Sequence, residues 1–177
     1  MENYLLENVI EFKPSLCGNK TFLIVHKLHR TPYHIGLISG ENYYALTING
    51  KEVMARAAML ENLANKAYNN LLIEIKRNDA VEFDPAPYFE NTELNHTDFV
   101  SCLYPVRAFL SALTSNNKTA EANNLFELLD TLQDANLAGI KMATRMNPIM
   151  EGKIVLQRYE TADIAKYIKK LNENKPT

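Results

Sequence analysis

Residues 33–50, YHIGLISGENYYALTING, decide the fold class of this 177-residue chain. Their β-branched and aromatic residues predict two strands, Tyr33–Ser39 and Tyr43–Asn49. The four residues 39–42, SGEN, suit a tight turn because glycine and asparagine tolerate positive φ. Two strands joined by so short a connection must run antiparallel. The stretch therefore predicts an antiparallel hairpin.

The same kind of pattern extends outward along the chain. Further strands are predicted at Thr21–Leu28 and Leu71–Lys76, with Lys153–Tyr159 as a fifth. Helical periodicity predicts four helices: Lys51–Asn69, Ser101–Thr114, Thr119–Leu137 and Thr161–Leu171. Adjacent strands on short turns indicate an α+β fold: a mainly antiparallel sheet of four to five strands covered by helices, with a helical C-terminal third.

Two further expectations concern order and packing. In the last predicted helix we expect the apolar residues to face inward: Ile164, Tyr167, Ile168 and Leu171. Residues 77–95 form the longest irregular segment, and connections of this length are typically functional or mobile. The length of 177 residues fits a single domain, residues 1–177, that needs no disulfide or metal to fold.

Composition restricts the classes of partner and the location. A formal net charge of −2 argues against nucleic acid as a partner, since such proteins normally carry a strong basic excess. We expect no membrane span, because the uncharged stretches fall well short of about 20 residues. The first residues lack a signal peptide, and two cysteines make no disulfide framework. A cytoplasmic location is expected, with signal-peptide-independent secretion as the open alternative.

Cys102 is the first candidate for chemistry. Ser101 is a good N-cap residue, which places Cys102 at the first helical position. The positive end of a helix favours a thiolate. His34, at the start of an inner strand, is the candidate base, and Asn49 or Glu52 could orient its ring. The alternative is that Cys102 only fills space in the core, as buried cysteines commonly do.

Other candidate groups predict no site. His26, His29 and His34 lie within nine residues, but no carboxylate or thiol stands at a metal-binding spacing from them. We therefore expect no metal. No glycine-rich phosphate loop is present, and we expect no cofactor. His96, ahead of the Cys102 helix, is expected in an exposed loop, with a second base for Cys102 as the alternative.

Two segments carry a resemblance to a known group. Residues 33–38, YHIGLI, followed by 41–46, ENYYAL, resemble the His-strand of circularly permuted papain-like proteins. Residues 98–103, DFVSCL, resemble the entry to their Cys-helix, and the likeness covers residues 33–49 and 98–110. The group includes lecithin:retinol acyltransferase-like enzymes, PPPDE-type isopeptidases and bacterial cell-wall amidase relatives. The resemblance implies amide or thioester chemistry with His34 as base and Cys102 as nucleophile, or a member that kept the fold and lost the chemistry.

Two interpretations of function follow. The first is a cysteine-dependent hydrolase of an amide, isopeptide or acyl bond, using Cys102 and His34 with Asn49 as the orienting group. The second is a non-catalytic binding protein, immunity-like or adaptor-like, whose C-terminal helices contact a protein or peptide partner. The hydrolase needs the thiol near an imidazole in an accessible cleft. Burial in an apolar pocket would instead raise the thiol pKa, so the sign of the shift separates the two interpretations. Neither interpretation sets the oligomeric state.

Overall fold

The computed structural model describes residues 3–65, 68–77, 83–90, 101–145 and 151–173. Its main sheet has seven strands in the order β2-β8-β7-β3-β4-β5-β6, and β1 pairs with β9 in a separate two-stranded ribbon. The strands are β1 Asn3–Leu6, β2 Val9–Glu11, β3 Thr21–His26, β4 His34–Ser39, β5 Asn42–Thr47, β6 Gly50–Ala55, β7 Leu71–Ile75, β8 Ala138–Ala143 and β9 Ile154–Gln157.

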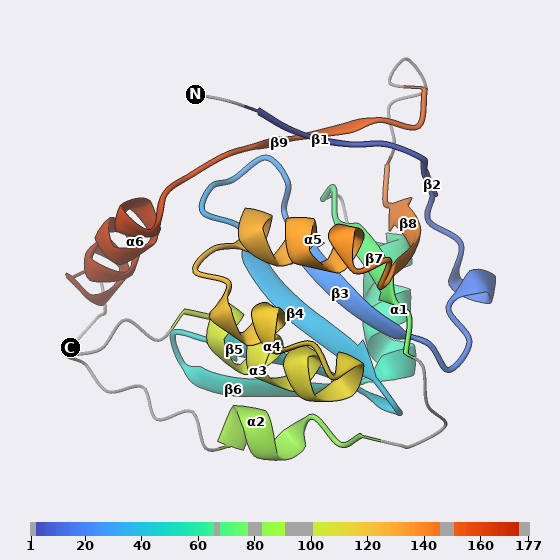
Figure 1. The fold of residues 1–177 in the computed structure, drawn as a ribbon, viewed down its shortest axis with the longest axis horizontal. Coiled ribbons are helices and arrows are strands. Elements are labelled where there is room, and N and C mark those ends of the chain that lie inside the picture. The colour runs from blue at the N-terminus through green and yellow to red at the C-terminus, as the bar shows by residue number, and fades with distance from the viewer. Residues whose placement is uncertain (1–2, 66–67, 78–82, 91–100, 146–150, 174–177) are drawn as a thin grey trace.

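The helices cover both faces of the main sheet (Figure 1). They are α1 Arg56–Asn65, α2 Ala86–Glu90, α3 Leu103–Thr114, α4 Asn117–Glu121, α5 Leu125–Asp134 and α6 Thr161–Glu173, with a short 3₁₀ turn at Pro14–Leu16. The main sheet is antiparallel throughout except for the β2–β8 pair, which is parallel. The α+β class and the mostly antiparallel sheet are thus confirmed.

The predicted helix from Lys51 was wrong over its first residues. Residues 50–55 form strand β6, and the helix begins only at Arg56. The hairpin register Thr47↔Gly50 leaves two residues in the turn, and Gly50 has φ +103°, which glycine accommodates without strain. Burial then alternates along β6, as expected for an edge strand with one solvated face. Asn49 consequently lies in a turn instead of on a strand.

The predicted sheet of four to five strands was too small, and the C-terminal third is not wholly helical. Strand β8 lies beside β7 with Leu71 opposite Ala143, a pairing of segments far apart in the chain. Strand β2 adds the parallel edge. The predicted fifth strand exists as β9, but it pairs with β1 instead of joining the main sheet. The local sequence does not predict these pairings, because each short strand is stabilised by a partner far away in the chain.

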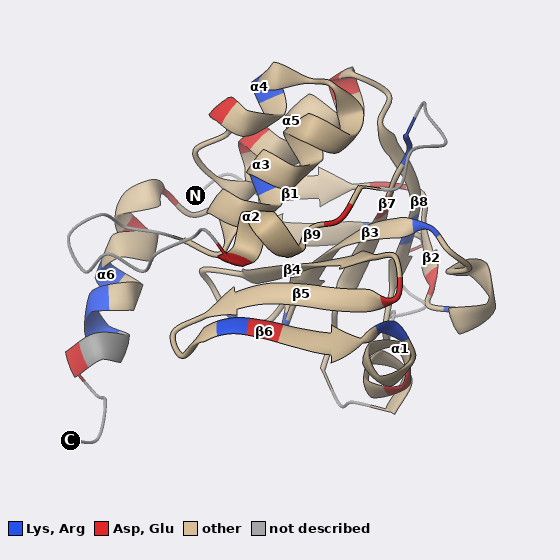
Figure 2. Cartoon of the chain, turned by 90° about the horizontal axis from the view of Figure 1, so that it is seen from below, with Lys and Arg blue, Asp and Glu red and all other residues tan. Residues whose placement is uncertain are grey.

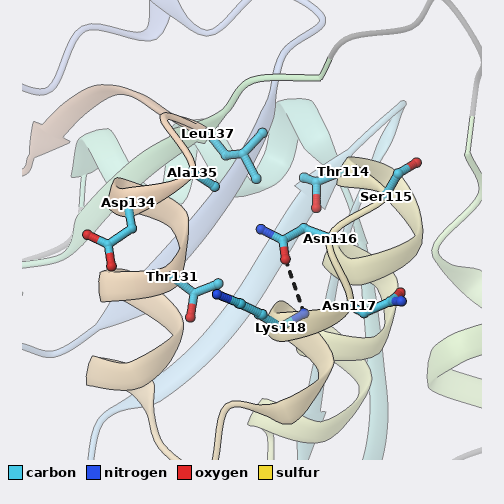
Figure 3. Close-up of a pocket in the computed structure, with 9 residues that line it drawn as sticks. All are labelled: Thr114, Ser115, Asn116, Asn117, Lys118, Thr131, Asp134, Ala135 and Leu137. Atoms are coloured by element: carbon cyan, nitrogen blue, oxygen red, sulfur yellow. Dashed lines mark hydrogen bonds between the residues drawn. The ribbon is translucent and has the colours of Figure 1, made fainter.

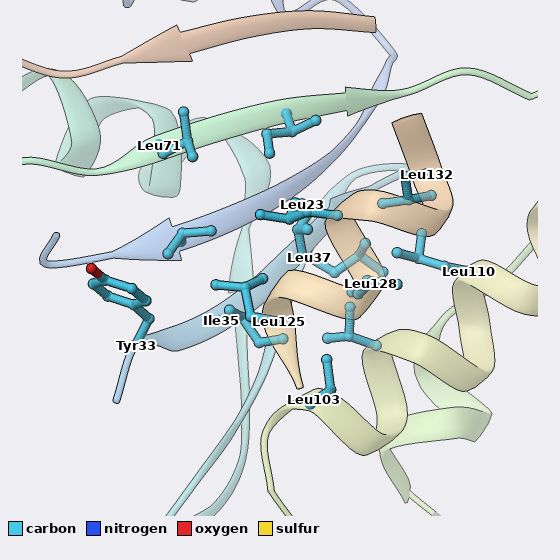
Figure 4. Close-up of a cluster of buried hydrophobic side chains, with 14 of the residues drawn as sticks. Leu23, Tyr33, Ile35, Leu37, Leu71, Leu103, Leu110, Leu125, Leu128 and Leu132 are labelled. Carbon is cyan, nitrogen blue, oxygen red and sulfur yellow. The ribbon is translucent and has the colours of Figure 1, made fainter. Parts of the chain in front are cut away.

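Alternation along the central strands sends side chains to two cores. The first core lies under α1, where Met59 and Leu63 pack on Phe22, Ile24 and Ile38. The second and larger core lies under α2, α3 and α5 (Figure 4). Its labelled members include residues from both the strands and the helices: Leu23, Ile35, Leu37, Leu103, Leu110, Leu125, Leu128 and Leu132.

The single helix predicted over residues 119–137 is two helices. Asn116 caps α4 by accepting from the backbone N–H of Lys118, and Asn124 caps α5 by accepting from Phe126 and Glu127. Asparagine at such positions satisfies backbone donors that a helix leaves unpaired. The break turns α5 so that its five buried residues face the sheet.

The β1–β9 ribbon runs beside α5 and closes the second core (Figure 1). The Tyr4 hydroxyl donates to Asp130 at 2.7 Å and accepts from Gln133 at 3.0 Å. The rings of Tyr33 and Phe126 both pack edge-on against Tyr159, at centroid distances of 5.6 and 5.2 Å. The first and last strands of the protein therefore hold each other over the same helix.

Two other expectations need correction or restriction. The apolar residues of α6 face inward only in part: Ile164 and Ile168 are half-buried, with Ile164 against the second core, whereas Tyr167 is 44% exposed. The side chain of Leu171 lies outside the described residues. Within the long connection, α2 is ordered and buries Phe89 against Tyr44, with ring centroids 5.6 Å apart. The rest of that connection, residues 78–82 and 91–95, lies outside the described residues. None of the described helices has the length and apolar character needed to cross a bilayer.

Candidate functional site around Cys102

Cys102 stands at the N-cap of the 12-residue helix α3, one position earlier than predicted. Ser101 precedes the helix, and its carbonyl accepts from the N–H of Tyr104 at 3.0 Å. Pro105 lies in the first turn, where a missing N–H costs no helix hydrogen bond. The local sequence therefore starts the helix at this point and presents the thiol at its positive end.

The thiol is surrounded by backbone N–H groups and by the second core. Cys102 packs against the core cluster that contains Ile35, and the residue as a whole is half-buried. Burial raises the pKa of the Cys102 thiol, while the N–H groups of Ile35, Cys102 and Leu103 act in the opposite direction. Burial is the largest of these effects, so the thiol stays protonated at neutral pH.

His34 lies on the opposite side of the sheet from Cys102. Side chains alternate along β4, so His34 is on the same face of the strand as Gly36 and Ile38, and this face lies under α1. Its ring stacks on that of His26, the cross-strand partner, at 5.5 Å. Burial lowers the pKa of His34, and Lys27 lowers it further. No hydrogen bond joins the imidazole to Cys102 within the described part of the chain.

His26 has a hydrogen-bonding partner in Tyr43, which lies on the same face of the sheet. The Tyr43 hydroxyl lies 2.9 Å from Nε2 of His26 and crosses over Gly36. A Cβ atom at Gly36 would fall 2.4 Å from the Tyr43 ring. Burial raises the Tyr43 pKa, with smaller contributions from the charges of Glu52 and a Cys102 thiolate.

Sequence reasoning missed Tyr43 and His26 as a pair. Gly36 in the middle of a strand was the available signal, since a strand glycine commonly marks the close approach of another group. The β3–β4 register, which sets His26 opposite His34, was the second requirement, and it is a tertiary property.

Asn49 is exposed in the β5–β6 turn, where its backbone N–H donates to the Thr47 hydroxyl at 3.2 Å. Glu52 follows on β6, opposite Ala45. Its charge acts on Tyr43, on the α1 side of the sheet. The role of Asn49 in orienting an imidazole stays a prediction.

The arrangement can do two things chemically. Backbone N–H groups at the sulfur would stabilise a thiolate or an oxyanion near it, as helix N-termini do. A buried, protonated thiol separated from its predicted base by a strand would instead be an inert core group. No cluster of three potential metal ligands occurs among the described residues.

Comparisons with protein-family models, curated proteins and solved structures found no match to this chain.

Proposed function

We propose that the protein is a non-catalytic interaction protein, immunity-like or adaptor-like, whose helix α6 contacts a protein partner. The supporting observation is an amphipathic helix that the fold leaves uncovered. Ile164, Tyr167 and Ile168 are spaced at i, i+3 and i+4, yet none is buried. Only Ile164 packs partly against the second core. An uncovered apolar stripe of this kind is typical of a binding surface.

The geometry of α6 suggests the kind of partner. Its 13 residues span about 20 Å at about 1.5 Å per residue, which suits an amphipathic helix lying in an apolar groove. Lys166 and Lys169 are exposed, and their spacing in the helix puts them on the face away from the apolar residues. Figure 2 shows basic positions along α6. We expect a protein with an apolar groove, from which the lysines on the opposite face would stay exposed to solvent.

The surroundings of Cys102 favour the same proposal. A thiol whose pKa is raised by burial is a weak nucleophile at neutral pH, because the thiolate is the reactive form. The predicted base, His34, faces the other side of the sheet. Neither group has the placement that the hydrolase interpretation requires.

Paired variants of α6 test the proposal. We expect proteins captured from lysate by the native chain to be captured also by Lys169→Gln but lost by Ile168→Gln, since anchor residues carry most of the affinity and Lys169 lies on the opposite face of the helix. Circular dichroism must show that both variants keep the native fold. Identical capture by both variants would contradict a contact through the apolar face of α6.

A thiol hydrolase of an amide, isopeptide or acyl bond is the second candidate. It is favoured by one observation: the N–H groups of Ile35 and Leu103 lie close enough to the Cys102 sulfur to favour its thiolate. In this function a base takes the thiol proton and the sulfur attacks the carbonyl carbon. The bond to the amine or alcohol then breaks as that leaving group takes up the proton, and water hydrolyses the resulting thioester to release the acid and restore the thiol.

The pH dependence of Cys102 alkylation separates the two candidates. In a Cys17→Ala chain, only one thiol reports. We expect slow labelling by iodoacetamide at pH 7 that accelerates only above about pH 8.5, the ordinary thiol pKa. Rapid labelling below pH 7 that collapses in His34→Ala would instead support the hydrolase and its predicted Cys102–His34 pair.

A further inference from the structure

An open hollow lies between the end of α3, the start of α4 and the last turn of α5 (Figure 3). Its volume is about 530 Å³. Side chains from all three helices and the turns after them line it, and most are polar. It is separate from Cys102 and from α6, so it plays no part in the function proposed above.

The two helix ends that face this hollow are already closed by their own backbone. After α3, Ser115 adopts φ +53°, and the N–H groups of Ser115 and Asn116 donate to carbonyls of the last turn. After α5, Asn136 adopts φ +54° and donates to Gln133, while Leu137 donates to Leu132 at 2.8 Å. Both ends are Schellman-type closures, which satisfy helix carbonyls that would otherwise attract a cation.

The polar groups of the hollow that remain available to a ligand are hydrogen-bond donors. The side-chain oxygen of Asn116 accepts from the Lys118 backbone at 3.1 Å, which leaves the two N–H bonds of its amide. The Lys118 side chain runs across the hollow toward Thr131, whereas the Asp134 carboxylate turns away from its centre (Figure 3). Within the described part of the chain, the Lys118 ammonium has no ion pair and the Thr131 hydroxyl no hydrogen bond.

We propose that this hollow binds the carboxylate or phosphate group of a small molecule, with Lys118, Asn116 and Thr131 as donors. Lys118, Asn116 and Thr131 all line the hollow, and an ammonium, an amide N–H and a hydroxyl can each donate to the acceptor lone pairs of an oxyanion. Leu137 is 7% exposed and gives the hollow one apolar wall, against which the carbon skeleton of the ligand would pack.

Titration followed by amide NMR shifts tests this site with inorganic phosphate, acetate and chloride at constant ionic strength. We expect saturable shifts confined to residues 114–118 and 131–137 with phosphate, acetate or both, and only weak linear shifts with chloride. The comparison of phosphate with acetate identifies the preferred oxyanion. Lys118→Met should raise the dissociation constant at least fivefold, and Asp134→Asn should lower it by removing a nearby negative charge.

Lys166→Met removes an equivalent charge from α6 and should leave the dissociation constant unchanged. Shifts that stay linear and equal to those of chloride would overturn the proposal. So would saturable binding that Lys118→Met does not weaken. Because no arm of the titration depends on α6 or on Cys102, these results are independent of the proposed function.

Discussion

At the scale of single residues, Gly36 is what allows Tyr43 to reach His26. Its missing side chain makes room for the Tyr43 ring, which reaches across β4 to hydrogen-bond His26. Tyr43 and Gly36 lie on neighbouring antiparallel strands, and the ring can lie this close to the β4 backbone because glycine has no Cβ atom. Sequence alone marks Gly36 as a strand glycine, and the structure supplies the reason for it.

Gly36→Ala should destabilise the protein by about 2 kcal/mol, because the added methyl group would overlap the Tyr43 ring. Urea denaturation measures the change in the free energy of unfolding. In a Tyr43→Leu background the same substitution should cost markedly less, since the ring is gone. Equal costs in the two backgrounds would show that the Tyr43 ring is not what excludes a side chain at Gly36.

The stability of the fold should fall as the pH falls through the range of His34. Its pKa is lowered in the folded state by burial and by Lys27, so the unfolded chain, with a pKa of about 6.5, binds the proton more readily. The stabilising contribution is therefore complete above about pH 6.5 and is lost below it. Urea melts at pH 7.5 and 5.5 should show a smaller difference for His34→Gln than for the native chain.

The matched control for that measurement is His29→Gln, because His29 is exposed. We expect its pH dependence to equal that of the native chain. If His34→Gln also kept the full pH dependence, another group would be responsible for it.

At the scale of elements, caps decide where helices start. The predicted helix over residues 119–137 is interrupted because Asn124 adopts an extended conformation, φ −146° and ψ 171°, and caps α5. The predicted helix from Lys51 is shortened because residues 50–55 pair with β5. In both places the apolar periodicity correctly indicated a helix. Its first residue, however, was set by hydrogen bonds that apolar periodicity cannot predict.

Asn124→Ala should cost about 1 kcal/mol of stability, because two backbone N–H groups of α5 lose their acceptor. The change is measured as the shift in the urea midpoint at constant slope. Asn117→Ala, at an exposed position in α4, serves as the control and should change stability by less than about 0.5 kcal/mol. A similar loss in both variants would mean that the cap is not the cause.

At the scale of the whole molecule, strands β1 and β9, far apart in the chain, close the second core together. The β1–β9 ribbon pairs residues 3–6 with 154–157 and covers the second core, to which it contributes Tyr4, Leu6 and Leu156. Helix α6 follows this closure, and none of its side chains that the structure describes is buried. We therefore expect the fold to depend more on β9 than on α6.

Truncation after Glu160 should leave the thermal midpoint within a few degrees of that of the full chain, since none of the described side chains of α6 is buried. Truncation after Lys153 should unfold the protein or strongly destabilise it, because it removes Leu156, which is fully buried, and Tyr159. Differential scanning calorimetry on both chains measures this. A midpoint that falls equally in both would show that α6 is part of the fold.

The sequence by itself determined the elements with strong local signals. The strands around residues 34–39 and 42–47, the helix near residues 101–114 and the position of Cys102 at its start all follow from alternation, turn residues and capping within a few positions. The α+β class follows from the same signals, because neighbouring strands on short turns can pair without help from distant segments.

Only the tertiary structure decided the partners and the surroundings. It set β8 beside β7 and β1 beside β9, put His34 and Cys102 on opposite faces, and left α6 uncovered. Each of these depends on contacts between residues far apart in the chain, and local propensity carries no information about them. The pKa of Cys102 shows the consequence: the helix start favours a thiolate, whereas burial by distant segments favours the neutral thiol and is the larger effect.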